Sequence, residues 1–348
     1  QEGAQAEVIV RSRVEWRRLL EEYWHKRIFI TQEQDYRHVL ARMSEERSVI
    51  APLLPQVPAA LRKAYEQETP PFSIILMNRV EECAPVRMDA PLNLLAARGS
   101  VSLTGCMSAK DTPLELYDVT SMYDSIILFE RANLMPTANV RQMLAEAASH
   151  GSIVLQEMDD HPHVNEAAAR DHYFLFRAVS AVQTSTKYLA EYLREFNPHV
   201  YLFENQLAEL PPARSYDENA PQTTIFFGAL NRRADWEPLM PSLNAAIQKH
   251  GDRLYFRVVS DYAFYQQLQT ERKSYVGGTQ DGSVVAPYER YVEELHSSDI
   301  ALLPLNDTEF NRAKSDLKFI EAAGNGAAVL AAPTVYAATV RDGETGLI

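Results

Sequence analysis

The sequence is poor in cysteine and contains no long hydrophobic run. Among its 348 residues only Cys83 and Cys106 are cysteines, and no CxxC motif occurs. This scarcity argues against a disulfide scaffold and against a structural zinc site. No stretch reaches the roughly 20 apolar residues that a transmembrane helix needs, and no charged-then-apolar signal segment opens the chain. These features favour a reducing compartment, and we expect a cytoplasmic location.

Positive charge is also scarce. The 34 lysines and arginines are outnumbered by 47 aspartates and glutamates, which gives a formal net charge of −13 at pH 7. A nucleic-acid-binding protein needs a basic face, so we expect no nucleic-acid partner. A small phosphorylated ligand needs only a local group of donors and positive charges, and the overall charge is compatible with such a ligand.

The pattern along the chain predicts two domains behind a helical extension. Residues 1–68 mix apolar and charged residues at helical spacing. From there on, short apolar runs alternate with helix-like segments, which is typical of a parallel sheet covered on both faces. The polar, turn-rich stretch 213–222 predicts a linker. We therefore expect an α/β fold with two doubly wound, Rossmann-like domains facing a cleft, at 69–215 and 216–348.

The segment FNRAKSDLKFIEAAGNGAAVLAAP (310–333) connects two predicted strands. Its first part follows the carboxyl end of a strand, where open α/β sheets bind ligands. We expect Ser315 to cap a helix that begins at Asp316. The N-terminus of that helix, with Arg312 and Lys314 beside it, would then offer backbone N–H groups and positive charge. This arrangement predicts a site for a phosphate or diphosphate.

Glu321 is a lone carboxylate within the apolar part of the same predicted helix. It follows Ser315 by six residues, which is roughly 9 Å along a helix axis. A diphosphate bound at the helix start would leave a nucleoside ribose at about that distance, and a carboxylate can accept hydrogen bonds from both ribose hydroxyls. The alternative is a solvated helix face on which Glu321 pairs with Lys318.

A second candidate site follows the strand-like run SIVLQ. The sequence EMDDHPH places Glu157, Asp159, Asp160, His161 and His163 at the predicted strand end. Carboxylates and imidazoles could bind a metal, and one aspartate could cap the following helix. We favour a third interpretation, in which Asp159, Asp160 or His161 positions a substrate hydroxyl and assists proton transfer.

Several motifs of the second half resemble the donor-binding domain of GT-B glycosyltransferases, particularly glycosyltransferase family 4. They are D-I-A-L-L-P-L, then K-S-D-L-K-F-I-E-A-A-G-N-G-A-A-V-L-A-A-P, then V-R-D-G-E-T-G-L-I. Further upstream, IFFGALNRRADW resembles the family's strand–glycine–basic segment, and VVAPYERYVEELHSSDIALLP resembles its base-binding region. The E-x-D-D strand end resembles first domains of bacterial surface-polysaccharide transferases. The resemblance covers roughly residues 71–348 and is strongest after residue 221.

The resemblance implies a donor site on the second domain, with the diphosphate on basic groups and the ribose on Glu321. The donor-binding residues that we expect are Gly228, Asn231, Arg232, Ala286, Tyr288, Lys314, Ser315, Asp316, Leu317 and Glu321. The catalytic residues that we expect are Asp159, Asp160, His161 and Glu309. Many family members carry an E-x7-E pair, and its first glutamate falls at Ala313 here. We expect Glu309 on the same loop to take that place near the transferred sugar.

The resemblance therefore implies a metal-independent, hexosyltransferase-like glycosyltransferase without a cofactor. It would move a sugar, with retention of configuration, from a nucleotide-diphosphate sugar to a hydroxyl of a glycan or lipid-linked acceptor. The expected setting is surface polysaccharide or glycoconjugate synthesis, in peripheral association with the inner face of the cell membrane. A catalytically silent GT-B module that acts as a binding or scaffold domain is the alternative, and a nucleotide-sugar epimerase is less favoured. Because the chain begins at Gln1 and stops before the family's final helices, we expect it to belong to a longer, multidomain protein.

Overall fold

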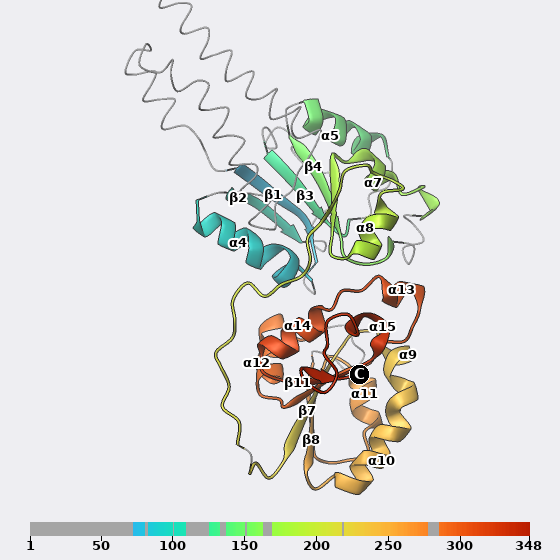
Figure 1. Cartoon of the computed structure of the whole chain (residues 1–348). Coiled ribbons are helices and arrows are strands. Elements are labelled where there is room, and N and C mark those ends of the chain that lie inside the picture. The colour runs from blue at the N-terminus through green and yellow to red at the C-terminus, as the bar shows by residue number, and fades with distance from the viewer. Residues whose placement is uncertain are drawn as a thin grey trace, which may run out of the picture. The chain divides into compact units, whose positions relative to one another are not determined.

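The computed structural model describes most of the chain after the predicted helical extension at 1–68, which lies outside the described residues. The described residues are 72–80, 83–99, 101–108, 125–132, 137–149, 152–162, 169–217, 219–277 and 285–348. The chain divides into two compact units, one up to Glu204 and one from Asn205 onward. Each unit is built around a six-stranded sheet flanked by helices (Figure 1).

The sheet of the first unit is parallel throughout and has the order β2-β1-β3-β4-β5-β6. Its strands are β1 (Phe72–Arg79), β2 (Val101–Ser108), β3 (Ser125–Glu130), β4 (Ile153–Met158), β5 (Ala181–Thr184) and β6 (Val200–Leu202). The chain reverses its direction of travel across the sheet between β1 and β3. Open α/β sheets bind ligands beyond the carboxyl ends of the strands at such a switch point.

Five helices accompany this sheet in the described residues. They are the π-helix η2 (Pro85–Asp89), α4 (Ala90–Ala97), α5 (Ala138–Ser149), α7 (Phe174–Ala178) and α8 (Lys187–Leu193). Helix α8 begins where the side chain of Thr186 accepts a hydrogen bond from the N–H of Leu189, as expected of a threonine N-cap. One face of the sheet packs its alternate apolar residues, such as Ile74, Leu76 and Leu128, against Met88 of η2 and Leu92 of α4.

The helix-like segment at 165–179 does not form one continuous helix over its described residues, 169–179. Helix α7 begins at Phe174, directly after His172 and Tyr173, which have left-handed backbone angles (φ 53° and 54°). The Tyr173 ring lies 4.4 Å from that of Phe196, centroid to centroid. This aromatic contact packs the residue against the end of α8, and the gain in packing overrides the local helix propensity.

The sheet of the second unit is also parallel and has the order β12-β11-β10-β7-β8-β9. Its strands are β7 (Thr223–Gly228), β8 (Leu254–Val259), β9 (Lys273–Val276), β10 (Ile300–Leu303), β11 (Ala328–Ala331) and β12 (Gly346–Leu347). Its helices are α9 (Arg233–Trp236), η6 (Glu237–Leu239), α10 (Met240–His250), α11 (Tyr262–Gln267), α12 (Tyr288–His296), α13 (Glu309–Arg312), α14 (Leu317–Gly324) and α15 (Pro333–Tyr336). Here the strand order reverses between β7 and β10.

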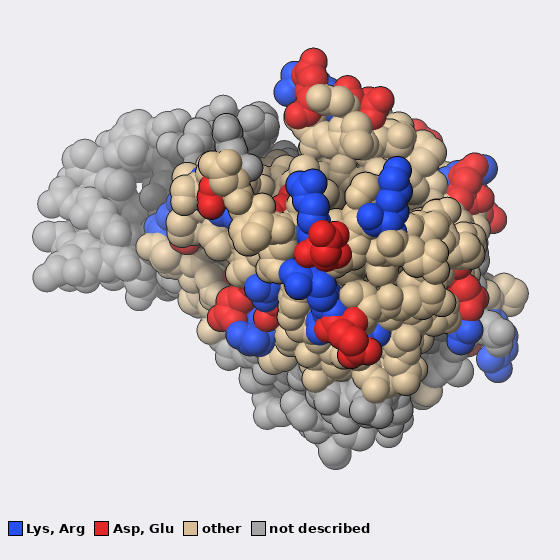
Figure 2. Space-filling view, turned by 90° about the horizontal axis from the view of Figure 1, so that it is seen from below, with Lys and Arg blue, Asp and Glu red and all other residues tan. Residues whose placement is uncertain are grey.

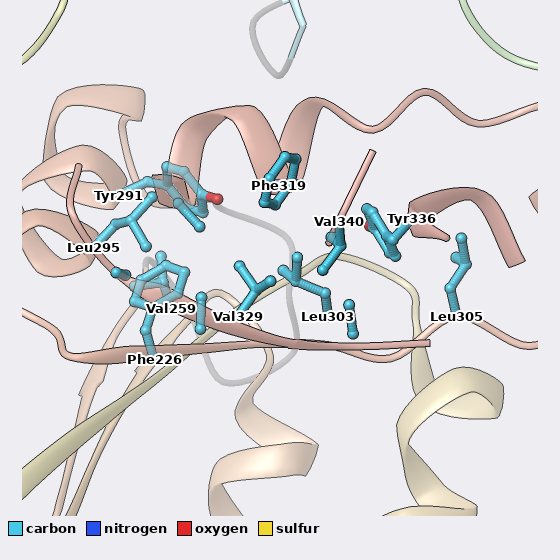
Figure 3. Close-up of a cluster of buried hydrophobic side chains, with 14 residues drawn as sticks. Phe226, Val259, Tyr291, Leu295, Leu303, Leu305, Phe319, Val329, Tyr336 and Val340 are labelled. Atoms are coloured by element: carbon cyan, nitrogen blue, oxygen red, sulfur yellow. The ribbon is translucent and has the colours of Figure 1, made fainter. Parts of the chain in front are cut away.

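Hydrophobic clusters lie on both faces of the second sheet. One cluster joins Phe226 of β7 to the helices α12 and α14 through Tyr291, Leu295 and Phe319 (Figure 3). The other contains Phe227, whose side chain points to the opposite face and packs with Trp236, Phe256 and Phe264. Successive residues of β7 are thus buried on opposite sides, as expected of a parallel strand between two helical layers.

The elements that the sequence did not predict are η2, the strands β2, β9 and β12, and the short helices α9, α11, α13 and α15. Helix α13 has four residues and α11 has six, and such short helices do not show a helical periodicity. Strand β2 contains Gly105 and several polar residues, while β9 is a half-buried strand at the sheet edge. These strands lack the continuous apolar run that identified the central strands.

An irregular segment connects β6 to β7 and includes the predicted linker at 213–222. Part of this segment is fixed to the second unit, because Arg214 donates to Asp299 Oδ1 at 3.1 Å and Tyr216 donates to the carbonyl of Gly326 at 2.5 Å. Gly326 itself has φ +77° and directly follows Asn325, the C-cap of α14, which is the usual position for a glycine at a helix end.

The described surface mixes charges of both signs on the face shown in Figure 2. On α12, for example, Arg290 forms ion pairs with Glu293 and Glu294, and Arg257 of β8 also contacts Glu294. None of the helices in the described part of the chain is long and apolar enough to cross a membrane.

A buried ion pair connects η2 to the sheet of the first unit. Arg87 is 4% exposed, and its Nε donates to Glu157 Oε1 at 2.8 Å while Nη1 donates to the Phe203 carbonyl at 2.8 Å. Burial raises the pKa of the Glu157 carboxyl, against the opposing charge of Arg87. The pair therefore connects three separate segments within a low-dielectric interior.

We expect Arg87→Met to lower the free energy of unfolding by about 3 kcal/mol at pH 8, because the Glu157 carboxylate loses its buried counter-ion. The loss should be smaller at pH 5.5, where the isolated carboxyl takes up a proton. Urea denaturation at both pH values measures this difference. The double variant Arg87→Met/Glu157→Met serves as the control and should recover most of the stability. Equal losses at both pH values, or a double variant no more stable than Arg87→Met, would contradict the expectation.

Candidate functional site

The second unit gathers most of the predicted donor residues at the carboxyl edge of its sheet. Gly228 ends β7, and a Cβ atom at this position would lie 2.6 Å from ring atoms of both Phe226 and Tyr291. Glycine is therefore required here by aromatic packing alone. Asn231 follows with a left-handed backbone (φ 55°), and this turn directs the chain into α9.

Two predicted diphosphate-binding cations share one aromatic ring. The guanidinium carbon of Arg232 lies 5.6 Å from the centroid of the Phe310 ring, and Lys314 Nζ lies 4.4 Å from the same centroid. Arg232 Nη1 also donates to Asn311 Oδ1 at 2.7 Å and contacts Asp235 Oδ2 at 3.3 Å. The structure thus brings Arg232 and Lys314, which are distant in sequence, close together around Phe310.

The prediction that Ser315 caps the donor helix is wrong. Helix α14 begins at Leu317 with Asp316 in the N-cap position, and the Asp316 side chain makes no capping hydrogen bond. Ser315 Oγ accepts a hydrogen bond from Asn205 Nδ2 at 2.7 Å and a long one from the N–H of Leu317, the first residue of α14, at 3.5 Å. The additional helix α13, capped by Thr308, occupies part of the predicted loop. Helix α14 then begins at Leu317, one residue later than predicted.

The position that corresponds to the first acid of the family's E-x7-E pair is packed inside the second unit. Ala313 is 0% exposed, so a glutamate at this position would place an unsolvated carboxylate in the interior. Glu309, which we expect to take its place, is the first residue of α13 and is exposed.

Glu321 is buried, with 1% of its surface exposed, so the predicted alternative of a solvated helix face is wrong, although the pairing with Lys318 that it included does form. Its Oε1 accepts a hydrogen bond from the Tyr288 hydroxyl at 2.9 Å, and its Oε2 accepts from the Tyr291 hydroxyl at 3.0 Å and from Lys318 Nζ at 3.3 Å. Burial, followed by the charge of Glu321, raises the pKa of both tyrosines. Tyr288 and Glu321, predicted separately as donor residues, are direct partners.

Ala286 and Leu317 complete the predicted donor group. The N–H of Ala286 donates to Ser260 Oγ at 3.3 Å, next to the carboxyl end of β8, and Ser260 has a left-handed backbone (φ 68°). The N–H of Leu317 points to Ser315 Oγ at 3.5 Å. Both lie on segments that follow carboxyl ends of strands, as ligand-binding residues of open sheets do.

The first unit carries a row of buried polar side chains that crosses three neighbouring strands. Glu130 of β3 pairs in register with Glu157 of β4, which pairs with Gln183 of β5, and all three are 0% exposed. Glu130 accepts hydrogen bonds from the N–H of Val80 at 2.8 Å and from Cys83 Sγ at 3.2 Å. The sequence analysis missed Glu130 and Gln183, although a polar residue within an apolar strand was a visible signal.

Arg131, which the sequence analysis also missed, binds both predicted catalytic aspartates. Its Nε donates to Asp159 Oδ1, and its Nη2 donates to Asp160 Oδ2 at 2.7 Å. His161 is 0% exposed and packs with its ring centroid 4.4 Å from that of Tyr192. The aspartates are partly exposed (14% and 19%), so they are the accessible part of this predicted acceptor group.

Among the described residues, no group of three or more His, Cys, Asp or Glu side chains is arranged to hold a metal ion. His163 lies outside the described residues. The carboxyl groups of the first unit can form hydrogen bonds and transfer protons. The second unit contains the positive charges of Arg232 and Lys314 and the buried carboxylate of Glu321.

Burial raises the pKa of Glu130 to about 7, although the Val80 N–H and the Cys83 thiol lower it. The folded chain therefore holds this proton more tightly than the unfolded chain, and the associated stability is lost as the pH rises through 7. Between pH 5.5 and 8, wild type should lose about 2 kcal/mol more unfolding free energy than Glu130→Gln, which cannot titrate. Urea denaturation across this range measures the difference. Glu195→Gln, an exposed glutamate of the same unit, is the control and should follow wild type. Parallel curves for wild type and Glu130→Gln would contradict the assignment.

Comparison with known proteins adds a likeness of fold. No protein-family model and no curated protein matches the sequence. An alpha-glucosyltransferase solved in complex with UDP-glucose and DNA containing an abasic site aligns with a TM-score of 0.51 at 10% identity, over 79% of this chain and 83% of that chain. Anabaena HepE, solved with UDP and glucose, gives 0.48 at 12% identity over 79% and 85%.

A TarM variant from S. aureus, solved with UDP among its ligands, gives a TM-score of 0.42 at 10% identity over 65% of this chain. The chain spans only 45% of the TarM length. Identities this low show the fold alone. The predicted fold class is confirmed: the chain is an α/β protein with two Rossmann-like units, as in GT-B glycosyltransferases.

Proposed function

We propose that the chain is a glycosyltransferase that takes a sugar from a nucleotide-diphosphate donor and transfers it to a hydroxyl group of a glycan or lipid-linked acceptor. The observation that carries the proposal is the group of residues around α14. Arg232 and Lys314 contact one ring shortly before this helix, and Tyr288 contacts Glu321 within it. Lys314 and Glu321 thus provide positive charge for a diphosphate and a carboxylate for a ribose on one short segment, and Arg232 adds a second cation beside Lys314. The fold is shared with UDP-sugar transferases.

The proposed chemistry is mainly electrostatic. The leaving diphosphate develops negative charge as the glycosidic bond breaks, and the guanidinium of Arg232 and the ammonium of Lys314 stabilise it. The N-terminus of α14, which follows Lys314, contributes backbone N–H groups. Because these groups supply the counter-charge, we propose that no metal is needed and that EDTA leaves activity unchanged. Retention of anomeric configuration, with Glu309 near the sugar, is also part of the proposal.

The proposed biological setting follows from the family resemblance of the sequence. Transferases of this kind extend surface polysaccharides or other glycoconjugates, and a lipid-linked acceptor would place the chain at the cytoplasmic face of a membrane. Asp159 and Asp160, held by Arg131, would position the acceptor hydroxyl and accept its proton.

Binding of nucleoside diphosphates tests the donor site. We expect UDP, ADP or GDP to stabilise the chain by about 2.7 kcal/mol at 100 times its Kd. Glu321→Ala should weaken the best of these ligands by about tenfold or more, because it removes the acceptor for the ribose hydroxyls, and should leave inorganic pyrophosphate unchanged. Titration calorimetry with both ligands measures the split.

Two variants sharpen this test. Lys314→Ala should weaken nucleoside diphosphate and pyrophosphate alike, whereas Lys249→Ala, an exposed lysine at the end of α10, should change neither. Glu321→Gln keeps the size of the side chain and separates loss of charge from loss of packing. Equal losses for both ligands in Glu321→Ala would remove Glu321 from the ribose site.

Turnover distinguishes an enzyme from a silent binding module. Asp160→Asn should leave donor binding unchanged and lower transfer from UDP-sugars about 10²-fold or more, because the asparagine cannot accept the hydroxyl proton. The measurement is release of UDP with a panel of sugar donors and polyol acceptors. A chain that binds donor normally but neither hydrolyses nor transfers from any of them is a silent module. Conversion of the donor to another nucleotide sugar would indicate an epimerase.

A further inference from the structure

The carboxylate of Glu321 is already hydrogen bonded at both oxygens. Oε1 contacts the Tyr288 hydroxyl at 2.9 Å, and Oε2 contacts the Tyr291 hydroxyl at 3.0 Å and Lys318 Nζ at 3.3 Å. A carboxylate offers about four lone-pair positions, so three are in use. A ligand that binds through two neighbouring hydroxyls needs two positions, and one protein donor must therefore leave.

The three donors differ in how firmly they are held. Tyr291 is 8% exposed, and its ring packs edge to face against Phe226 with centroids 5.2 Å apart. Displacing Tyr291 would disturb the hydrophobic cluster between β7, α12 and α14 (Figure 3). The Lys318 side chain is more exposed (41%), but its Nζ is the counter-ion of a buried carboxylate and lies 3.9 Å from the centroid of the Tyr291 ring. Displacing Lys318 would leave the buried charge of Glu321 without its ion pair, which costs more than the loss of a neutral hydroxyl donor.

Tyr288 is the donor that can move at the lowest cost. It is half-buried and is the first residue of α12, where its side chain is not enclosed by a preceding helical turn. Its ring stacks on the outer side of this group, 6.0 Å from Tyr291 with an interplanar angle of 17°. Its ring packs against the border of the hydrophobic cluster and is not one of the buried members, so a rotation of its side chain frees Glu321 Oε1 and disturbs the core less than displacement of Tyr291 would.

A phenol hydroxyl and a ribose hydroxyl are the same type of donor to a carboxylate, with the same preferred O···O distance. We propose that the Tyr288 hydroxyl is an internal substitute for a ribose hydroxyl, which the nucleoside displaces when it binds to Glu321. This inference rests on the proposed nucleotide-diphosphate site and concerns how that site selects its ligand. The substitute keeps a buried carboxylate hydrogen bonded at all times, because an unsatisfied one is costly.

Displacement of the Tyr288 hydroxyl also makes the affinity depend on whether the ligand has two neighbouring ribose hydroxyls. A ribonucleoside supplies two hydroxyls and replaces the bond that it breaks. A 2′-deoxyribonucleoside supplies one hydroxyl, which can use the remaining lone pair while Tyr288 stays in place. Tyr288 therefore lowers the affinity for ribonucleotides and leaves the affinity for deoxyribonucleotides unchanged.

The test is Tyr288→Phe, which removes the hydroxyl and retains the ring. We expect UDP to bind about 3- to 10-fold more tightly to this variant, since no internal hydrogen bond has to be broken. The affinities for 2′-deoxyuridine diphosphate and for inorganic pyrophosphate should stay within twofold of wild type. Titration calorimetry on the full chain measures all three ligands, and ADP or GDP with its deoxy counterpart replaces UDP if it binds more tightly.

Tyr291→Phe is the matched control, because it removes one hydroxyl from the same carboxylate at a position that the ligand does not take. It should give no gain in affinity for UDP and should lower the melting temperature more than Tyr288→Phe does. The inference is overturned if Tyr288→Phe binds UDP no more tightly than wild type, or if the deoxy ligand gains equally.

The outcome separates this inference from the proposed function. If Glu321→Ala loses UDP binding while Tyr288→Phe is unchanged, the donor site stands and only the role of Tyr288 is wrong. If no nucleoside diphosphate binds to the wild-type chain, the proposed function and the role of Tyr288 are both wrong.

Discussion

A parallel sheet that is buried on both faces leaves almost no room for polar side chains within its strands. All residues of β3 and β4 are buried, and Phe226 and Phe227 of β7 point into separate hydrophobic clusters. Burial of apolar surface on both sides stabilises such a sheet, and each polar group inside it needs a partner. Functional groups therefore collect where the strands end, and in both units the predicted site residues lie at that edge.

In the first unit, three polar side chains lie within buried strands, and each needs a hydrogen-bond partner there. Glu130 accepts hydrogen bonds from a backbone N–H and a thiol, and Glu157 Oε1 accepts one from Arg87 of η2, whereas Glu157 Oε2 has no hydrogen bond within the described residues. Gln183, the next member of the row, has no hydrogen bond to either amide atom within the described residues. Along each strand, a member of this row comes two residues after a member of the hydrophobic cluster that includes Leu92 of α4. The Arg87–Glu157 ion pair and the Glu130 carboxyl therefore lie between this cluster and the partly exposed aspartates.

In the second unit, aromatic rings position the charged groups. Phe310 lies beside both Arg232 and Lys314, which can approach each other because the face of an aromatic ring attracts cations. Tyr291 contacts Glu321 through its hydroxyl and Lys318 through its ring. Aromatic side chains thus position the charges used for the proposed donor site, and a side chain at position 228 would lie too close to the rings of Tyr291 and Phe226.

The central strands, the longer helices and the general position of the proposed donor site can be predicted from the sequence. Apolar runs without polar interruption identified the central strands, and the order of strand, basic loop, helix and Gly326 placed Lys314 and Glu321 on one segment, because these signals act between near neighbours in the chain. Tertiary structure alone decided which groups meet. It buried Glu321 between two tyrosines, paired Arg131 with Asp159 and Asp160, and moved the start of α14 past Ser315. Such contacts join residues far apart in sequence, and their formation depends on packing and on the satisfaction of buried polar groups, which no local pattern records.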